Sequence, residues 1–187
     1  MTITLASIAS AVEALHQGDV IAYPTEAIYG LGCDPHNPDA IERLLQLKQR
    51  PIEKGLILVA SSVDQLSHWI DDMTLTEQAS VVASWPGPVT WLFPAKKPLP
   101  ACITGLHDTV ALRVTNHPVV RDICDAFGGA IVSTSANVAD HPPARTVDEC
   151  QRYFHGDLTH IVKGELGSSD KPSVIKDVIT GRVVREG

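Results

Sequence analysis

The stretch V-I-A-Y-P-T-E-A-I-Y-G-L-G, residues 20–32, introduces the pattern that the remainder of the chain follows. Its first four residues are apolar and predict a short buried strand, which Pro24 is expected to end. Thr25 and Glu26 follow at once, and two glycines then let the backbone come close to a ligand. A buried strand that runs into polar residues is typical of α/β proteins, which build ligand sites at strand ends. An ordinary proline-glycine turn explains the same residues equally well.

Helical patterns flank this strand on both sides. Ser7 predicts the N-cap of one helix, and Gly18 predicts its end, because glycine readily adopts the left-handed backbone conformation that closes a helix. Asn37 followed by Pro38 predicts the start of a second helix. This helix is expected to end near Arg50, because a residue that precedes proline avoids the helical conformation.

The rest of the chain continues to alternate between strand and helix patterns. Short apolar runs predict buried strands at residues 56–59, 89–93, 110–114 and 130–133. Thr146 and Glu149 have the spacing of a capping box and predict a helix through Phe154. Residues 173–175 and 182–185 predict a closing hairpin around a Thr-Gly turn. The fold class we expect is therefore α/β.

Composition limits the function classes. A chain of 187 residues fits a single domain over 1–187, with 44% hydrophobic residues to form its core. It has neither an apolar run that could cross a bilayer nor a secretory leader, so we expect a cytoplasmic protein without membrane contact. The formal net charge of −7 argues against a protein that mainly grips nucleic-acid phosphates, although a local basic groove is compatible with it.

No metal or redox site is expected. The four cysteines, Cys33, Cys102, Cys124 and Cys150, lie far apart in the sequence and form no C-x-x-C pair, so we interpret them as free thiols. The eight histidines show no H-E-x-x-H or similar spacing, so we interpret them as surface or hydrogen-bonded structural residues.

Three cations gather at the end of the second predicted helix, namely Lys48, Arg50 and Lys54. Cations near a helix C-terminus are favoured by the helix dipole, and this alone accounts for many such residues. Here a proline fixes the loop that carries them towards the next strand, so they are expected beside a strand end. Converging Lys and Arg side chains suit a triphosphate.

Arg113 interrupts an apolar strand, and a buried guanidinium needs an anionic partner. An internal salt bridge and a substrate carboxylate both satisfy that need. The rigid segment W-P-G-P-V-T, residues 85–90, has no titratable group, and we interpret it as scaffold or pocket wall.

The segment Ser133-Thr134-Ser135-Ala136-Asn137 is rich in hydrogen-bond donors and follows a predicted strand. A serine nucleophile is not expected there, because no G-x-S-x-G elbow surrounds these residues and the sequence points to no histidine partner. Binding is the better interpretation.

Five segments together resemble the YrdC-like family of enzymes that make threonylcarbamoyl-AMP. They are P-T-E-x-x-Y-G-L-G, K-x-R-P, W-P-G-P-x-T, A-L-R-V and S-x-S-A-N, in this order over nearly the whole chain. The resemblance implies a twisted mixed β-sheet flanked by helices around a concave basic cavity. It also implies that ATP, L-threonine and bicarbonate are converted into threonylcarbamoyl-AMP and pyrophosphate for the threonylcarbamoyl-adenosine modification of tRNA.

Residue roles are carried over by motif position. The resemblance implies that Lys48 and Arg50 act electrostatically, without a covalent nucleophile. It assigns ATP to Arg50, Lys54, Thr109, Ser135, Asn137, Arg145 and Arg185. It assigns L-threonine to Thr25, Arg113, Ser133 and Ser173. Val59 stands where some members have a histidine near the substrate, and we expect the additional C-terminal domain of longer members to have no counterpart here.

The cofactor and partners follow from the same resemblance. Mg²⁺ is expected to arrive with ATP, without a dedicated protein site. The product is expected to pass to a downstream threonylcarbamoyl-transferase complex, and weak direct contact with tRNA is compatible with this role. Two other readings stay open: a non-catalytic module that binds double-stranded RNA or tRNA, and a carbamoyl-handling domain that serves another acceptor.

Overall fold

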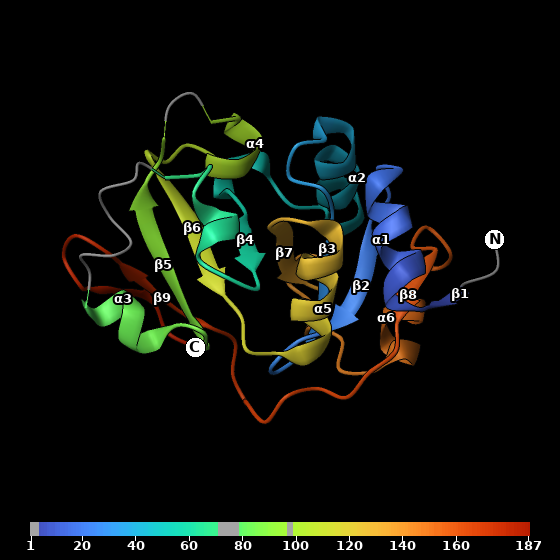
Figure 1. Ribbon diagram of the computed structural model, residues 1–187. Helices are drawn as coiled ribbons and strands as arrows, with labels where there is room; N and C mark the ends of the chain where they lie inside the picture. The colour runs from blue at the N-terminus through green and yellow to red at the C-terminus, as the bar shows by residue number, and fades with distance from the viewer. Residues whose placement is uncertain (1–3, 71–78, 97–98) are drawn as a thin grey trace.

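The computed structural model describes residues 4–70, 79–96 and 99–187. In chain order the elements are β1 (Thr4–Ala6), α1 (Ile8–His16), β2 (Ile21–Pro24), β3 (Tyr29–Gly32), α2 (Pro38–Lys48), η1 (Ile52–Lys54), β4 (Ile57–Ala60), η2 (Asp64–Leu66), α3 (Ala79–Ser84), β5 (Val89–Pro94), α4 (Ala101–Thr104), β6 (Thr109–Val114), α5 (Pro118–Phe127), β7 (Ile131–Ser135), α6 (Val147–Phe154), β8 (His160–Val162), β9 (Val174–Asp177) and β10 (Val183–Arg185). Helices and strands alternate along most of the chain, so the predicted α/β class is confirmed (Figure 1).

The described strands form one mixed sheet in the order β1-β8-β2-β3-β7-β4-β6-β5-β9-β10. The pairs β1/β8, β8/β2, β4/β6 and β5/β9 run parallel, and the other neighbours run antiparallel. Parallel neighbours need crossover connections, which explains the helices between them. The predicted twisted mixed sheet with flanking helices is confirmed (Figure 1).

Alternate residues of each strand pack into two different core layers. Tyr23 of β2 packs with α1 and α5, which lie on one face of the sheet. Ala22 and Leu31 pack on the other face, in the layer to which α2, α3, α4 and α6 contribute their buried residues. The sheet is thus covered on both faces, and α1 and α5 contact mainly the strands β8, β2 and β4.

Helix starts follow the local chemistry that the sequence predicted. Asn37 Oδ1 accepts hydrogen bonds from the backbone N–H groups of Asp39 and Ala40, at 3.1 and 3.2 Å. Ser7 Oγ accepts one from Ser10 N at 3.2 Å, so both predicted N-caps are confirmed. α2 ends at Lys48, two residues before the predicted boundary.

One detail of the predicted capping box at α6 differs from expectation. Thr146 does cap α6, because its Oγ1 accepts from Glu149 N at 3.2 Å. In a capping box the carboxylate of Glu149 would accept from the backbone N–H of Thr146. Here it accepts from the backbone N–H of Arg145, one residue earlier, at 2.6 Å. The predicted closing hairpin is confirmed, because β9 and β10 pair antiparallel.

β2 ends at Pro24, so the prediction that this proline ends the strand is confirmed. β2 includes Pro24, whose partner is Tyr29 in β3, and the polar segment between them is the turn of a hairpin. The pairing of β2 with β8 stops at Ala22, so the missing N–H of Pro24 leaves no gap in that ladder. Gly32 in β3 is required by close packing, because a Cβ atom there would lie 2.7 Å from Val132 O and 2.8 Å from the Tyr23 ring.

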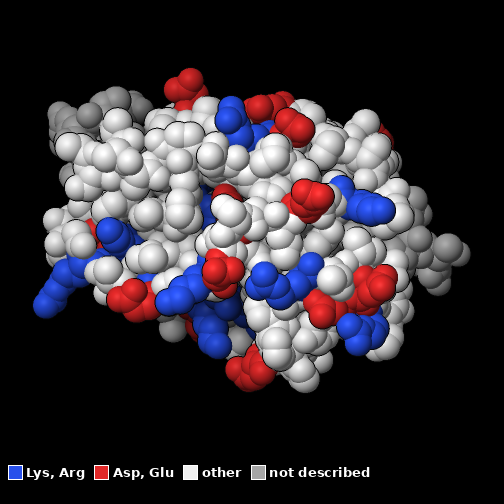
Figure 2. Space-filling view, turned by 90° about the horizontal axis from the view of Figure 1, so that it is seen from below, with Lys and Arg blue, Asp and Glu red and all other residues white. Residues whose placement is uncertain are grey.

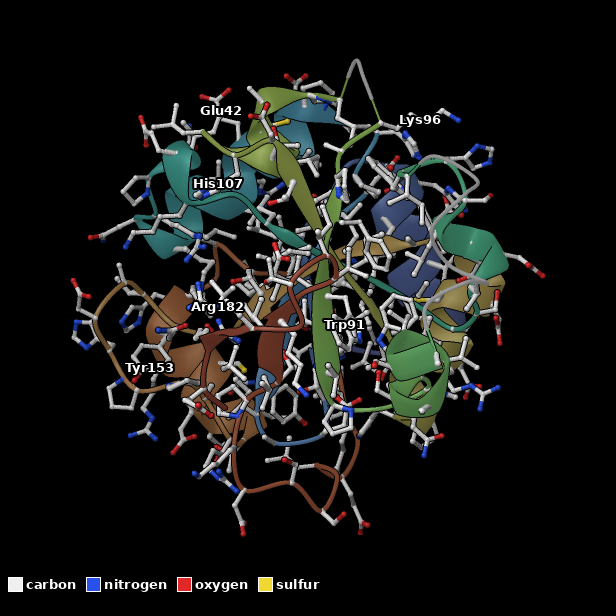
Figure 3. All side chains as sticks on the ribbon, turned by 90° about the vertical axis from the view of Figure 1, so that its left-hand side faces the viewer. Glu42, Trp91, Lys96, His107, Tyr153 and Arg182 are labelled. Atoms are coloured by element: carbon white, nitrogen blue, oxygen red, sulfur yellow. The ribbon has the colours of Figure 1, made fainter. Side chains whose placement is uncertain are left out.

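The strands β1 and β8 were not predicted, since each is only three residues long. The rigid segment before β5 does serve as scaffold. Trp85 Nε1 donates to Val89 O at 2.7 Å, and Trp91 Nε1 donates to Ser84 Oγ at 2.9 Å. Figure 3 shows Trp91 in the interior beside β5, whereas Lys96 lies at the periphery. Within the described ranges no helix combines the length and apolar character that crossing a bilayer requires.

Replacing Asn37 by alanine should lower the free energy of unfolding by about 1 kcal/mol, because two backbone donors at the start of α2 lose their acceptor. Urea denaturation measures this change, and Asn37→Asp, which keeps an acceptor oxygen, should stay close to the wild type. Equal midpoints and slopes for the wild type and Asn37→Ala would contradict the capping role.

Candidate active site

A hollow lies on the sheet face that also carries α1 and α5. It is bounded by the turn after β2, by β4, β6 and β7, and by the residues just before β9 and in β10. Its cavity volume is about 180 Å³, which is below the roughly 300–1,000 Å³ of enclosed small-molecule sites because the hollow is open to solvent on one side. Seven predicted site residues line it: Thr25, Arg50, Arg113, Ser133, Ser135, Ser173 and Arg185.

The other predicted residues lie outside this lining. They are Lys48, Lys54, Thr109, Asn137 and Arg145. Lys54 is exposed at the end of η1, and Arg145 is exposed just before α6. Thr109 begins β6 opposite Pro94 and shares a strand face with Arg113, four residues away.

Lys48 is a buried internal cross-link. Only 3% of the residue is exposed, and Nζ donates to Ser135 O, to Asn137 O at 3.1 Å and to Asn137 Oδ1 at 3.0 Å. Each ammonium proton therefore has an acceptor. Burial, together with the nearby Arg50, lowers the pKa of Lys48 to about 7. Lys48 thus positions the loop that carries Ser135 and is not among the lining residues of the hollow.

Asn137 completes the same cross-link. Its Oδ1 also accepts from Ser135 Oγ at 2.6 Å, and its Nδ2 donates to His141 O at 2.7 Å. Both ends of the amide are therefore occupied within the protein. The amide orders the loop after β7 and fixes the direction of the Ser135 hydroxyl.

Four cations and one carboxylate line the hollow: Arg50, Arg113, Lys171, Arg185 and Glu26. Arg50 Nη2 donates to Gly55 O and Arg185 Nη2 to Ser173 O, both at 3.0 Å. Burial lowers the pKa of Arg50. The pKa of Arg185 is lowered first by partial desolvation of its guanidinium and then by repulsion from Arg50 and Arg113. The guanidinium groups are therefore close enough to repel one another.

Glu26 is a site residue that the sequence did not assign. Its carboxylate accepts from Arg113 Nη2 and from Thr115 Oγ1, the latter at 2.6 Å. Burial alone would raise the pKa of Glu26, but Arg113 and Thr115 outweigh it, so the pKa lies below its ordinary value and the group is ionised. The sequence did contain a signal for Glu26, because a buried Arg113 needs an anionic partner.

Both readings of Arg113 therefore find support in the structure. The guanidinium forms an internal ion pair with Glu26, with 13% of the arginine side chain exposed. It nevertheless lines the hollow, and its buried Nε has no partner among the described residues. Donor capacity for an anionic ligand thus remains.

The hydroxyl groups of the hollow are held in fixed directions. Ser133 Oγ accepts from Tyr23 Oη at 2.9 Å, and burial raises the pKa of Tyr23 so that it stays a donor. Thr25 Oγ1 donates to Ile28 O at 2.7 Å. Ser173 Oγ lies 2.9 Å from Thr90 Oγ1, which places the threonine of the scaffold segment behind the site. No histidine is among the described lining residues, so none of these serines has a general base of that kind beside it.

His117 departs from the interpretation of the histidines. It is 4% exposed, its Nε2 lies 3.1 Å from Glu165 O, and its buried Nδ1 has no partner in the described part of the chain. Burial lowers its pKa, so the imidazole is neutral at pH 7 and Nε2–H donates to Glu165. The interpretation as a fully hydrogen-bonded residue is wrong for His117.

Comparison with known proteins identifies relatives along the whole chain. The sequence model of the Sua5/YciO/YrdC family, described as "Telomere recombination", matches residues 13–187. A threonylcarbamoyl-AMP synthase of Enterobacter sp. (strain 638) is 51% identical over 185 residues, which cover 98% of this chain and 97% of the relative. The enzyme of that name from Vibrio parahaemolyticus is 49% identical over 178 residues, 94% of this chain and 96% of the relative.

Solved structures of members of the same family also match this chain. The structure of P. abyssi Sua5 complexed with L-threonine matches with a TM-score of 0.85 at 29% identity, over 94% of this chain and 52% of that chain. This chain therefore spans about half the length of that Sua5. E. coli YciO matches with a TM-score of 0.82 at 27% identity, over 96% of this chain and 88% of that chain.

Replacing Glu26 by glutamine should lower the free energy of unfolding at pH 7 by about 3 kcal/mol, because the largely buried Arg113 loses its counterion. The folded-state pKa of Glu26 is depressed, so its contribution is fully present above 4.5 and is lost as the pH falls through the folded-state value. Denaturation of both proteins from pH 7 to pH 2 should therefore show their difference shrinking with acid. A difference in the free energy of unfolding that stays constant with pH would disprove the role of the ion pair. So would a difference no larger than that of the exposed control Glu53→Gln.

Proposed function

The chain belongs to the Sua5/YciO/YrdC family, and on this premise we propose that it is a threonylcarbamoyl-AMP synthase. It converts ATP, L-threonine and bicarbonate into threonylcarbamoyl-AMP and pyrophosphate, a nucleotidyl transfer. The observation that carries the proposal is the convergence of Arg50, Arg113 and Arg185 with oriented hydroxyl groups in one hollow. Relatives of about half identity over nearly their full length bear this name.

L-Threonine occupies the end of the hollow nearest Arg113. A guanidinium suits a carboxylate because it offers parallel donors in a fixed plane. Arg113 pairs with Glu26 through Nη2, and its buried Nε has no partner among the described residues, so it still has a donor to offer a carboxylate. Thr25, Ser133 and Ser173 offer hydroxyl groups for the remaining polar atoms of threonine.

ATP occupies the side of the hollow marked by Arg50, Arg185 and Ser135. Two guanidinium groups with few internal partners suit phosphate oxygens. Lys54, Thr109 and Arg145 lie beyond the lining, so they contact the nucleotide where it extends past the mouth. Asn137 and Lys48 act from behind by ordering the loop of Ser135.

The chemistry requires no nucleophile from the protein. The neutral amine of threonine attacks carbon dioxide derived from bicarbonate and gives a carbamate, and the amine proton that this displaces goes to solvent. A carbamate oxygen then attacks the α-phosphorus; this new P–O bond replaces the bond to pyrophosphate, which leaves with its electron pair. The protein contributes by holding the two anions together and by stabilising charge on the phosphoryl oxygens.

Mg²⁺ enters as part of the substrate MgATP. It commonly keeps several waters and binds through phosphates. Glu26 is the carboxylate of the described lining and is already engaged by Arg113 and Thr115, so the phosphates supply the ligands. The ion neutralises part of the triphosphate charge.

The reactivity of the product indicates where the protein acts and which protein receives the product. An acyl adenylate hydrolyses readily, so it passes to a separate threonylcarbamoyl-transferase complex that modifies tRNA, with at most weak tRNA contact by this chain. We place the protein in the cytoplasm, and its free thiols support this because a reducing compartment preserves them.

Pyrophosphate release from ATP tests the proposal. Release should depend on both L-threonine and bicarbonate and should stop when either is left out. Salt-sensitive RNA binding without turnover would instead support the RNA-binding module. Turnover that another amine sustains better than threonine would support the carbamoyl-handling reading.

Arg50→Ala should slow adenylate formation by roughly 10²–10³, because one preorganised charge facing the phosphates is lost. Single-turnover formation of threonylcarbamoyl-AMP measures the rate. Arg43→Ala is the control, because Arg43 lies on α2, the helix that precedes Arg50, and pairs with Asp19 outside the hollow. Near-normal rates in Arg50→Ala would remove Arg50 from the site.

Arg113→Lys should weaken threonine binding by about tenfold although the charge is retained, because a planar pair of donors becomes a point charge. Calorimetric titration with L-threonine measures the affinity, with thermal unfolding of each variant as the control for folding. Unchanged affinity would leave Arg113 with a purely internal role beside Glu26.

A further inference from the structure

The segment between β8 and β9, residues 163–173, reaches the hollow from a distant part of the sheet. β8 lies next to β2 near one end of the strand order, and β9 lies next to β5 near the other. Figure 1 shows the connection crossing the lower side of the molecule between them. Its last residues, Lys171, Pro172 and Ser173, line the hollow.

This segment is pinned to the turn after β2. Gly167 N donates to Thr25 O at 2.9 Å, and Ser169 N donates to Glu26 O at 3.0 Å. A Cβ atom on Gly167 would lie 2.8 Å from Glu26 Cα, so the two backbones are in direct contact. The segment is therefore fixed against the residues that hold Arg113.

The backbone of Lys171 is fixed on both sides. Ser169 Oγ donates to Lys171 O at 2.8 Å and accepts from Lys171 N at 3.4 Å. The next residue is Pro172, whose ring restricts its backbone, and Ser173 bonds to the buried Thr90. The side chain of Lys171 thus begins from a defined point at the mouth of the hollow.

The ammonium of Lys171 differs from the other cations of the site. Arg113 has Glu26, and the guanidinium groups of Arg50 and Arg185 each have a carbonyl. No described residue forms a hydrogen bond or ion pair with Lys171 Nζ. Lys171 lines the same hollow as Arg50, Arg113 and Arg185, so an anion bound there would have four positively charged side chains around it.

The charge balance indicates which anion that is. Glu26 balances the charge of Arg113, the residue to which the carboxylate of L-threonine is assigned. Arg50, Lys171 and Arg185 remain without an opposite charge in the lining. Three cations match a polyphosphate better than an amino acid. Figure 2 views the molecule from below, and Lys and Arg side chains lie close together there below the middle of the surface, with Asp and Glu side chains among them.

We propose that Lys171 is a further binding residue of the site, whose ammonium contacts the polyphosphate of the nucleotide and of the pyrophosphate product. The inference rests on the proposed synthase function. It adds a residue of the connecting segment to the phosphate side, so that binding of the nucleotide also engages residues 163–173.

The experiment compares the wild type with Lys171→Gln, Lys171→Arg and Lys163→Gln. Lys163 is the matched control, because it is an exposed lysine on the same segment outside the lining. Binding of inorganic pyrophosphate is measured by calorimetry, and KM for ATP and for threonine by product formation, each at two salt concentrations. Lys171→Gln should weaken pyrophosphate binding and raise KM for ATP by about tenfold, as expected for one charge-assisted hydrogen bond.

Three further results support the proposal: a smaller effect of Lys171→Gln at high salt, recovery in Lys171→Arg, and unchanged kinetics in Lys163→Gln. Wild-type behaviour of Lys171→Gln in both assays would overturn it, as would a change in KM for threonine alone. If the wild type itself releases no pyrophosphate from ATP with threonine and bicarbonate, the proposed function fails instead. The two failures are therefore distinguishable.

Discussion

The ion pair between Glu26 and Arg113 is the interaction on which the site depends. Three guanidinium groups converge on one hollow, and the pKa of Arg185 is lowered first by desolvation and then by repulsion from Arg50 and Arg113. Glu26 is the one carboxylate of the described lining, and its own pKa is lowered by the cation that it stabilises. The pair needs a turn from the β2–β3 hairpin and a strand, β6, that lies four places along the sheet from β2. The site therefore exists only in the folded sheet.

The same carboxylate-bearing turn also holds the segment that closes the hollow. The backbone oxygens of Thr25 and Glu26 accept from Gly167 and Ser169, so one short turn fixes Arg113 on one side and the connecting segment on the other. A substitution that shifts this turn would move both the carboxylate-binding and the phosphate-binding side. This shared support brings the hydroxyl groups of Thr25 and Ser173, which lie far apart in the sequence, to the same hollow.

Local chemistry made much of the fold predictable, because caps and short apolar runs act within a few residues. Asn37 and Ser7 could be recognised as caps for that reason. β3 could not, since its two glycines suggest a turn until the packing of Tyr23 and Val132 against Gly32 is known. The strands β1 and β8 are too short to show a pattern and are defined by each other.

The candidate site was predictable as a set of residue types, but their directions were not. Lys48 and Arg50 stand two residues apart at one helix end, and sequence spacing treats them alike. The left-handed residue Gln49 between them turns the chain, so that Lys48 is buried against the loop after β7 while Arg50 lines the hollow. Glu26 escaped assignment because it gains its role from a neighbour more than eighty residues away, Arg113. A charged side chain acquires its function from the field of its neighbours, and the fold decides which neighbours it has.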